Sequence, residues 1–294
     1  MNASEREFIV DAPAPLLSYL LASLAGKSRS TVKSMLASRQ VSVNGNVATR
    51  FDTPLQAGDR VRANMKKGSA TLSYPDLEIV YEDEALIVIN KHHGLLSVAT
   101  ERERERTAYR ILTDYARRAG PGNRVFVLHR LDRETSGLMM FAKSEEVQET
   151  MQREWDAMVT SRKYVAVVEG RPARDSGVIT AGLLENRAMK VYMSEEGRKA
   201  ATRYTTLKTN GEYTLLELEL ETGRKNQIRV HAAGIGHPVA GDSKYGARSN
   251  PIRRLALHAR ELHFIHPLSR RELHFQTDIP KRFSLLVKQR ERKK

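Results

Sequence analysis

The sequence predicts an α+β fold in two parts, and three observations support this prediction. Apolar runs of strand length are separated by turn pairs such as Asn210-Gly211, which is typical of paired strands. Residues 108–116 carry apolar side chains at helical spacing, which indicates an amphipathic helix. A chain of 294 residues is long enough for one large and one small domain. We therefore expect a small α+β domain over residues 1–70 and a larger α+β domain over residues 71–294.

The net charge of +14 is concentrated in two segments. Residues 13–70 hold nine Lys or Arg against two Asp, and residues 281–294 hold seven against one Glu. Solubility alone does not require such concentration, whereas a basic surface attracts phosphates and releases their counterions on contact. The charge distribution therefore favours a nucleic acid as the partner.

Several classes of site and location are disfavoured by composition. Cysteine is absent, which excludes disulfides, thiolate nucleophiles and cysteine-ligated zinc. The apolar run at residues 16–25 is too short to cross a bilayer and lacks the basic leader of a signal peptide. The late histidines have neither a carboxylate nor a cysteine to complete a ligand set, and on a strand they would face opposite sides; they are His258, His263, His266 and His274. We expect a soluble cytoplasmic protein without a membrane segment or a bound metal.

The small domain is expected to begin with two short helices. Residues 15–24 predict the first, which ends at Gly26. The second begins near Ser28 or Ser30 and places Val32, Met35 and Leu36 on one apolar face. Short strands follow at residues 41–43 and 60–62, each next to a turn. This arrangement leaves four cations for solvent or a ligand, which are Lys27, Arg29, Lys33 and Arg39.

After a linker at residues 66–75, the larger domain is expected to alternate strands and helices. Helices begin after the capping residues Thr107 and Ser144. The second of these helices would place Val147, Met151, Trp155 and Met158 in one stripe, so the single tryptophan is expected in the core. The strands are expected at residues 77–81, 85–90, 162–170, 204–208 and 213–221.

One stretch carries the candidate chemistry, the sequence HRLDRETSG at residues 129–137 between two apolar runs. Asp132 lies between Arg130 and Arg133, and neighbouring cations favour the ionised form of a carboxyl group. Such a carboxylate suits a nucleophile or an electrostatic stabiliser. A plain turn between two strands uses the same residue types, so the residues alone leave both interpretations open.

HRLDRETSG resembles the signature of the RluA-type pseudouridine synthases, which isomerise uridine to pseudouridine in structured RNA. In that family the aspartate of HRLD is catalytic, which implies this role for Asp132. The stretch RKYVAVVEG at residues 162–170 resembles a second motif whose tyrosine enters the active site, here Tyr164. Without the family, a tyrosine at the start of a strand is more often a packing residue.

Further motifs extend the resemblance from about residue 74 to residue 280. TGRKNQIRVH at residues 222–231 resembles the motif whose arginine pairs with the catalytic aspartate, here Arg229. Asn226 stands where the family commonly has a histidine, and His92 stands where it usually has a proline. The stretches GDSKYG and LHA at residues 241–246 and 257–259 complete the match.

The resemblance implies a mixed, largely antiparallel sheet with flanking helices, the pseudouridine synthase fold. The small domain resembles an RNA-binding domain named after a small-subunit ribosomal protein. The reaction involves no redox change, so no cofactor is expected. The resemblance implies that Tyr164 stacks on the uracil and that Arg130 fills the gap left by the flipped base. We assign His129, Arg130 and Arg133 to substrate binding, and Lys27, Arg29, Lys33 and Arg39 to RNA binding.

Large-subunit (23S) rRNA is the favoured substrate, by analogy with enzymes that carry such an N-terminal domain, and tRNA is the alternative. A non-catalytic rRNA-binding assembly factor would use the same basic surfaces but would not need Asp132, Tyr164 and Arg229 together. An RNA methyltransferase is remote because the sequence lacks a glycine-rich cofactor loop. We expect a monomer.

Overall fold

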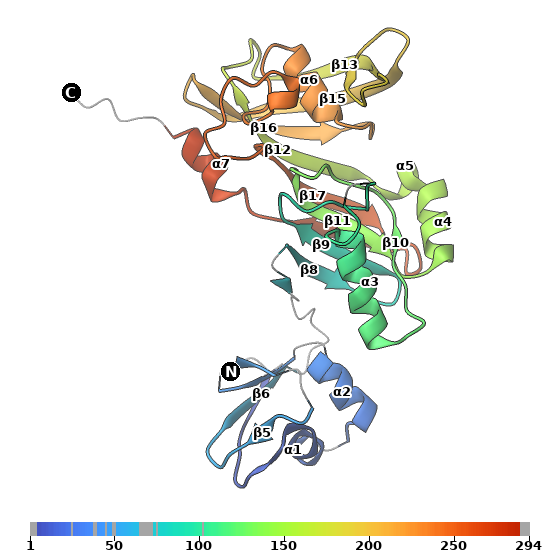
Figure 1. Cartoon of the computed structure of the whole chain (residues 1–294), viewed down its shortest axis with the longest axis vertical. Coiled ribbons are helices and arrows are strands. Elements are labelled where there is room, and N and C mark those ends of the chain that lie inside the picture. Colours follow the sequence, from blue (N-terminus) through green and yellow to red (C-terminus); the bar gives the residue numbers. More distant parts are fainter. Residues whose placement is uncertain are drawn as a thin grey trace, which may run out of the picture. The chain divides into compact units, whose positions relative to one another are not determined.

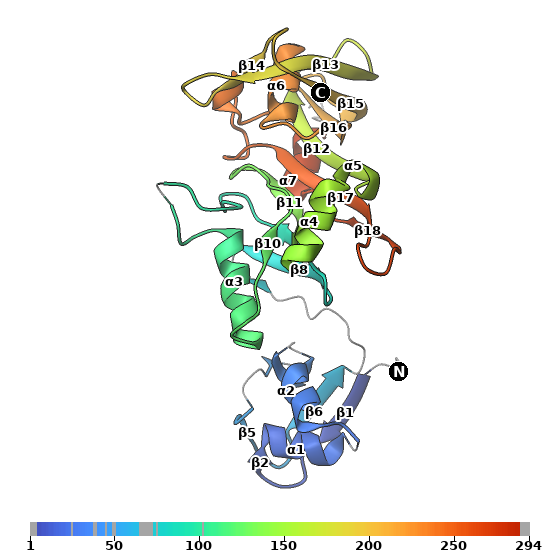
Figure 2. The ribbon, with the colours of Figure 1, turned by 90° about the vertical axis from the view of Figure 1, so that its right-hand side faces the viewer.

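The computed structural model describes residues 5–24, 26–37, 40–44, 46–48, 51–64, 73–74, 76–101 and 103–288 (Figures 1 and 2). The contacts divide the chain into two compact units. Unit 1 contains residues 1–74 and 78–82, and unit 2 contains residues 75–77 and 83–294. Most of the expected linker and Arg39 lie outside the described residues, and the domain boundary at residue 70 stays a prediction. Across the described ranges, no helix is long and apolar enough to cross a bilayer.

Unit 1 contains a four-stranded sheet in the order β1-β6-β3-β4. The sequence missed β1, which pairs antiparallel with β6 even though its residues show no clear apolar period. The strands of this sheet are β1 (Glu5–Ile9), β3 (Val41–Val43), β4 (Asn46–Val47) and β6 (Arg60–Asn64), and a separate pair is formed by β2 (Ala14–Pro15) and β5 (Pro54–Leu55).

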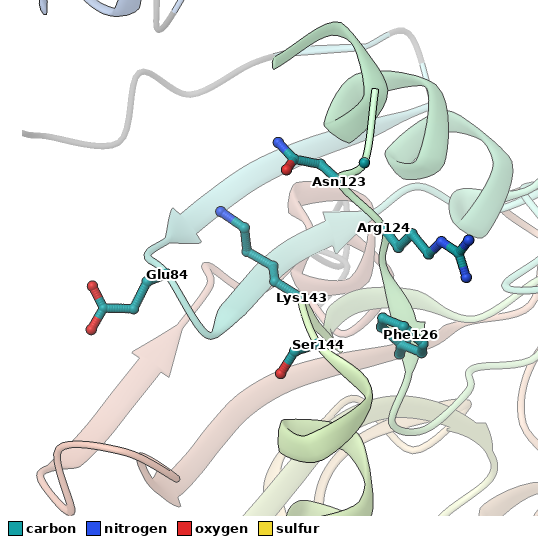
Figure 3. A pocket seen from close by; sticks show the side chains of 7 residues that line it. Glu84, Asn123, Arg124, Phe126, Lys143 and Ser144 are labelled. Carbon is teal, nitrogen blue, oxygen red and sulfur yellow. The ribbon is translucent and has the colours of Figure 1, made fainter. Parts of the chain in front are cut away.

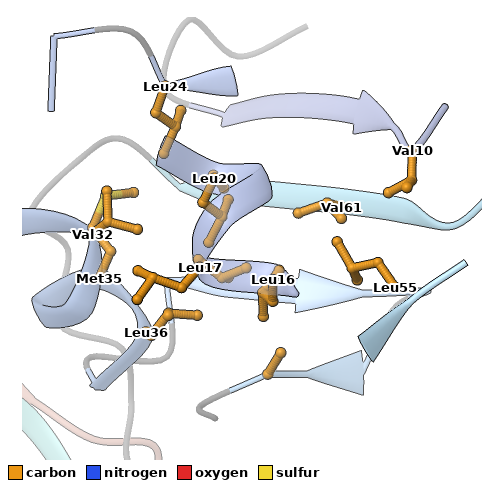
Figure 4. Close-up of a cluster of buried hydrophobic side chains, with 13 residues drawn as sticks. Val10, Leu16, Leu17, Leu20, Leu24, Val32, Met35, Leu36, Leu55 and Val61 are labelled. Carbon is orange, nitrogen blue, oxygen red and sulfur yellow. The ribbon is translucent and has the colours of Figure 1, made fainter. Parts of the chain in front are cut away.

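Two helices, α1 (Leu16–Ser23) and α2 (Arg29–Ala37), supply much of the core of unit 1 (Figure 4). The hydroxyl of Ser28 accepts a hydrogen bond from the backbone N–H of Thr31, which caps α2 as predicted. The predicted apolar face of α2 is buried, and it consists of Val32, Met35 and Leu36. This packing leaves Lys27, Arg29 and Lys33 exposed.

Unit 2 is built on a large sheet whose strands run in the order β14-β13-β15-β16-β12-β17-β11-β9, with β10 beside β11 and β18 beside β17. The pair β11 and β17 is parallel, and the neighbouring pairs that we describe are antiparallel. This confirms the mixed, largely antiparallel sheet. The strands are β9 (Leu86–Lys91), β10 (Phe126–Val127), β11 (Ser136–Ala142), β12 (Ser161–Glu169), β13 (Ser176–Glu185), β14 (Val191–Met193), β15 (Arg198–Thr209), β16 (Tyr213–Leu220), β17 (Leu257–Ile265) and β18 (Glu272–Gln276), and β7 (Ser73–Tyr74) and β8 (Leu77–Glu82) precede them in the chain.

The helices of unit 2 confirm both predicted capped starts. Thr107 and Ser144 cap their helices by accepting hydrogen bonds from backbone N–H groups three residues later. The helix after Ser144 is shorter than expected because it stops at Glu154 and restarts, so Trp155 is half-buried beside Arg162 rather than within the core. The helices are α3 (Ala108–Ala119), α4 (Glu145–Arg153), α5 (Trp155–Met158), α6 (Gln227–Gly234), the 3₁₀ turn η1 (Ser243–Tyr245) and α7 (Lys281–Leu286). Helix α6 lies against β13 and β15 (Figures 1 and 2).

A row of paired residues crosses four strands at the centre of unit 2. Lys91 on β9 pairs with Gly137 on β11, Gly137 pairs with Ala259 on β17, and Ala259 pairs with Tyr164 on β12. Gly137 has φ +115°, and a Cβ atom there would lie 2.1 Å from the carbonyl oxygen of Ala259. Only glycine permits this close approach of β11 to β17. The row therefore brings Tyr164 towards the loop that precedes β11.

We expect Gly137→Ala to destabilise unit 2 by roughly 3 kcal/mol, because the added methyl group collides with backbone and the φ value is unfavourable for alanine. Urea unfolding followed by the fluorescence of Trp155, the only tryptophan, measures this unit. Gly122→Ala is the matched control, since a Cβ atom there meets nothing within 4 Å. Equal stability of the two variants would contradict the close approach.

Candidate active site

Asp132 lies in the loop that joins β10 to β11, and its side chain is 29% exposed. One carboxylate oxygen accepts a hydrogen bond of 3.0 Å from Nη1 of Arg229. Arg229 belongs to α6, which is 97 residues away in sequence. The structure therefore brings together the two residues whose pairing the sequence predicted, and it leaves part of the carboxylate open to solvent.

A second carboxylate, Asp242, holds the other side of the Arg229 guanidinium. Nε of Arg229 donates to one oxygen of Asp242 at 2.7 Å, and Nη2 donates to the other at 2.8 Å. Burial opposes the charged form of Arg229, but the hydrogen bonds and negative charge of Asp242, with Asp132, raise its pKa above the usual value. The Asp242 side chain is only 1% exposed, so this fork is shielded from solvent.

The backbone of the Asp132 loop is anchored from the segment after β9. The hydroxyl of Ser97 donates to the carbonyl of Leu131 at 2.7 Å and accepts from its N–H at 3.0 Å. The N–H of Gly94 donates to the carbonyl of Arg133 at 2.8 Å. The two residues that flank Asp132 are thus fixed through their main chains.

Lys91 supplies a third anchor from inside the protein. Its side chain is fully buried, and Nζ donates to the carbonyl oxygens of His92, Leu95 and Arg133 at 3.1, 2.8 and 3.2 Å. Three carbonyl acceptors match the three N–H donors of an ammonium group. Burial lowers the pKa of Lys91 to about 7, with Glu134 and Asp132 acting in the opposite direction. A titratable group therefore supports the loop.

Tyr164 lies at the start of the buried part of β12, next to a register shift between Lys163 and Tyr164. Only 9% of the residue is exposed. Burial raises the pKa of its hydroxyl, and the negative charge of Asp132 acts in the same direction. Tyr164 is therefore a neutral aromatic residue near the candidate carboxylate.

The other residues of the central motif differ in their surroundings. Arg130 and Arg133 are exposed, and Nε of Arg133 donates to the carbonyl of Gly94. Nε2 of His129 accepts a hydrogen bond from the N–H of Met140, and burial lowers the pKa of His129 to about 3. A neutral ring that holds the loop has a structural role, and the substrate-binding role of His129 stays a prediction.

Sequence reasoning did not assign roles to Lys91, Ser97 or Asp242, nor to Tyr245, whose ring centre lies 5.0 Å from the guanidinium carbon of Arg229. The charged residue Lys91 at the end of an apolar strand was one available signal, because a buried lysine needs partners. The stretch GDSKYG was noted only as part of a resemblance, yet it supplies both Asp242 and Tyr245. Their roles depend on contacts between segments far apart in the chain.

A separate hollow of about 480 Å³ lies at the start of α4 (Figure 3). Its cations are accompanied by a carboxylate, so its charge is mixed, and it includes none of the predicted site residues. It is lined by Glu84, Gly122, Asn123, Arg124, Phe126, Lys143 and Ser144. In the part of the chain that the structure describes, no group of three or more His, Cys, Asp or Glu is placed to hold a metal ion.

Known proteins resemble this chain in sequence and in fold. The family model for RNA pseudouridylate synthase matches residues 85–234. An uncharacterized RNA pseudouridine synthase of Bacillus subtilis (strain 168), YjbO, is 35% identical over 72% of this chain and 76% of its own length. Ribosomal large subunit pseudouridine synthase D of Escherichia coli (strain K12) is 32% identical over 86% and 83%. The solved structure of human RNA pseudouridylate synthase domain containing 4 has a TM-score of 0.58 at 25% identity, over 70% of this chain and 90% of that protein.

We expect the stability of the wild type relative to Lys91→Met to rise as the pH increases above 7. The unfolded chain keeps a lysine protonated up to about pH 10.5, whereas in the folded protein Lys91 loses its proton from about pH 7. The unfolded state therefore binds more protons between these two pH values. The free energy of unfolding of the wild type, relative to that of Lys91→Met, then rises by up to about 1 kcal/mol per pH unit. Urea unfolding from pH 6 to pH 9.5 measures it, and parallel curves for the two proteins would contradict it.

Proposed function

The chain belongs to the RluA-type RNA pseudouridylate synthase family, and we propose that it isomerises specific uridines in large-subunit (23S) rRNA with Asp132 as the catalytic carboxylate. The observation that carries this proposal is the array in which Asp242 fixes Arg229 and Arg229 holds a partly exposed Asp132. An exposed turn residue would not need a shielded ion pair behind it. The array favours the catalytic interpretation of HRLDRETSG over the plain turn.

The reaction breaks the bond between N1 of uracil and C1′ of ribose, rotates the base, and joins C5 to C1′. The proton on C5 is lost and N1 gains one, so the product is an isomer and no oxidant or reductant is consumed. Breaking a glycosidic bond calls for a carboxylate close to an electron-poor sugar carbon. Asp132 attacks or stabilises C1′, or removes a sugar proton, while Arg229 holds the carboxylate in position.

The target base must leave its stack before it can reach Asp132. In our proposal Tyr164 offers a neutral aromatic face to the uracil and assists the loss of the C5 proton. Arg130 is exposed and can occupy the gap that the flipped base leaves. Arg133 contacts the neighbouring backbone of the RNA. Both arginines supply the cations that phosphates attract.

The choice of rRNA over tRNA is supported by the relative that is named a ribosomal large subunit pseudouridine synthase and that aligns with 86% of this chain. In unit 1 the exposed cations Lys27, Arg29 and Lys33 form the proposed RNA-binding surface, to which Arg39 is added from the sequence. A monomer in the cytoplasm, acting on RNA alone, completes the proposal.

The double variant Lys27→Gln/Lys33→Gln should bind rRNA fragments more weakly. The negative slope of log binding constant against log salt concentration should become less steep by about 2, because about one counterion is released per phosphate contact. Filter binding at several salt concentrations measures both effects. Arg60→Gln/Arg62→Gln is the matched control in the same unit, since both arginines already pair with Glu7. An equal loss in the control would show that total charge, not this surface, sets the affinity.

Asp132→Asn should abolish pseudouridine formation and leave RNA affinity within about threefold, because the shape is kept and the negative charge is removed. Carbodiimide-based pseudouridine mapping of total RNA, from cells that lack the protein and carry wild type or variant, tests this. Asp175→Asn is the control, since Asp175 is an exposed carboxylate paired with Arg171.

The pattern of lost sites separates the candidate functions. Loss of specific large-subunit sites that only the wild type and Asp175→Asn restore supports the whole proposal. Loss of tRNA sites instead keeps the reaction and corrects the substrate. Unchanged sites in every strain would favour the non-catalytic rRNA-binding factor, and full activity of Asp132→Asn would refute the role of Asp132.

A further inference from the structure

Asn226 lies immediately before α6 and points between Asp132 and Tyr245. Its side chain is buried, with 9% of the residue exposed, and its backbone has φ +55°. One end of the amide is 2.9 Å from the hydroxyl of Tyr245. The other end is 2.8 and 3.0 Å from the two carboxylate oxygens of Asp132. The orientation of this amide therefore decides what Asp132 meets.

Hydrogen bonding selects one orientation of the amide. The backbone N–H of Val191 donates to the hydroxyl of Tyr245 at 3.3 Å, so the hydrogen of that hydroxyl is free to point towards Asn226. The amide oxygen of Asn226 then accepts from Tyr245, and its NH₂ group donates to both oxygens of Asp132.

The opposite orientation is less favourable. It would gain one contact of 3.4 Å between the amide oxygen and Nη1 of Arg229. It would also set that partly negative oxygen against the carboxylate of Asp132 at 2.8 to 3.0 Å. A buried amide that faces a charged acceptor presents its donor, because a repulsive contact there is not relieved by water.

We propose that Asn226 is a positioning residue for the reaction: its amide donates to the Asp132 carboxylate beside Arg229, and the hydroxyl of Tyr245 fixes the amide in that orientation. This inference rests on the proposed catalytic role of Asp132. Asp132 is then held by two side chains, three residues apart at the start of one helix, that share a side of α6. A planar carboxylate with donors from two directions has one orientation instead of a range.

The 3₁₀ turn η1 and the residue before it support both donors. Asp242 holds Arg229 through two hydrogen bonds, and Tyr245 holds Asn226 through one. The guanidinium carbon of Arg229 also lies 5.0 Å from the centre of the Tyr245 ring, a cation–π contact. The stretch GDSKYG thus affects Asp132 indirectly, by holding Arg229 and Asn226, the two residues that contact it.

The test compares Asn226→Asp, Asn226→His and Tyr245→Phe. Asn, Asp and His all tolerate a positive φ better than most residue types, so the backbone at position 226 is retained in both of its variants. Asn226→Asp keeps the shape but replaces the donor by an oxygen that faces a carboxylate. We expect its single-turnover rate constant at saturating RNA to fall about 10- to 100-fold, the loss expected for a hydrogen bond to a charged group, with unchanged RNA affinity.

Asn226→His keeps an N–H donor and is expected to retain a rate within about threefold of the wild type. Tyr245→Phe removes only the hydroxyl and should lower the rate about threefold to tenfold, because the amide loses its fixed orientation. Asn186→Asp is the matched control, since the side-chain oxygen of Asn186 accepts from the N–H of Lys190 and aspartate retains that bond. Thermal unfolding of each variant is measured alongside, so that a loss of rate is read only from folded protein.

A wild-type rate in Asn226→Asp, or an equal loss in Asn226→Asp and Asn226→His, would overturn the inference. If Asn226→Asp fails to fold, a wild-type rate in Tyr245→Phe overturns it and a reduced rate supports it. Asp132→Asn distinguishes a failure of this inference from a failure of the proposed function. An inactive Asp132→Asn with a fully active Asn226→Asp removes only the inference, whereas an active Asp132→Asn removes the proposed function as well.

Discussion

The guanidinium of Arg229 lies between two carboxylates, and the geometry of the candidate site depends on how this one positive charge is shared. Asp242 accepts two hydrogen bonds from the guanidinium and is almost fully shielded, while Asp132 accepts one from it and remains partly exposed. Buried ion pairs contribute little net stability, because desolvation offsets their attraction. We therefore interpret the array as a device for orientation: Asp242 removes the freedom of Arg229, and Arg229 removes that of Asp132.

The fold positions Asp132 in this array by fixing both the main chain of its loop and its side chain. The main chain is anchored by Ser97 and Lys91, and the strand that follows is drawn against β17 at Gly137, where no Cβ atom fits. The side chain is then held by groups from α6. Because main chain and side chain are fixed by different segments, the carboxylate position is determined by tertiary contacts that form only when unit 2 is folded. Binding energy from the RNA need not be spent on ordering this loop.

Local regularities were predictable from the sequence, and long-range contacts were not. The buried face of α2 and the caps at Thr107 and Ser144 follow from side-chain spacing and from hydrogen bonding within one turn. The strand β1 has no clear period of its own and is recognised only through its pairing with β6. The break at Glu154 interrupts an apolar stripe that otherwise continues, which is why Trp155 was expected in the core. The pairing of Asp132 with Arg229 was predicted from the family resemblance, whereas the supporting roles of Lys91 and Asp242 were visible only in the folded structure.

An enzyme that acts on RNA faces a particular difficulty in using an arginine to hold a carboxylate. Phosphates are strong, bidentate partners of guanidinium groups, and a substrate brings many of them close to the site. A free Arg229 could exchange Asp132 for a phosphate and so lose its hold on the carboxylate. Asp242 opposes this exchange, because it already binds Nε and Nη2 of Arg229 and its own side chain is only 1% exposed. A neutral amide such as that of Asn226 has the complementary advantage, since it donates to the carboxylate without attracting phosphates. Asp132 thus has one charged donor, Arg229, whose charge is paired with Asp242, and one neutral donor, the amide of Asn226, which needs no such pairing.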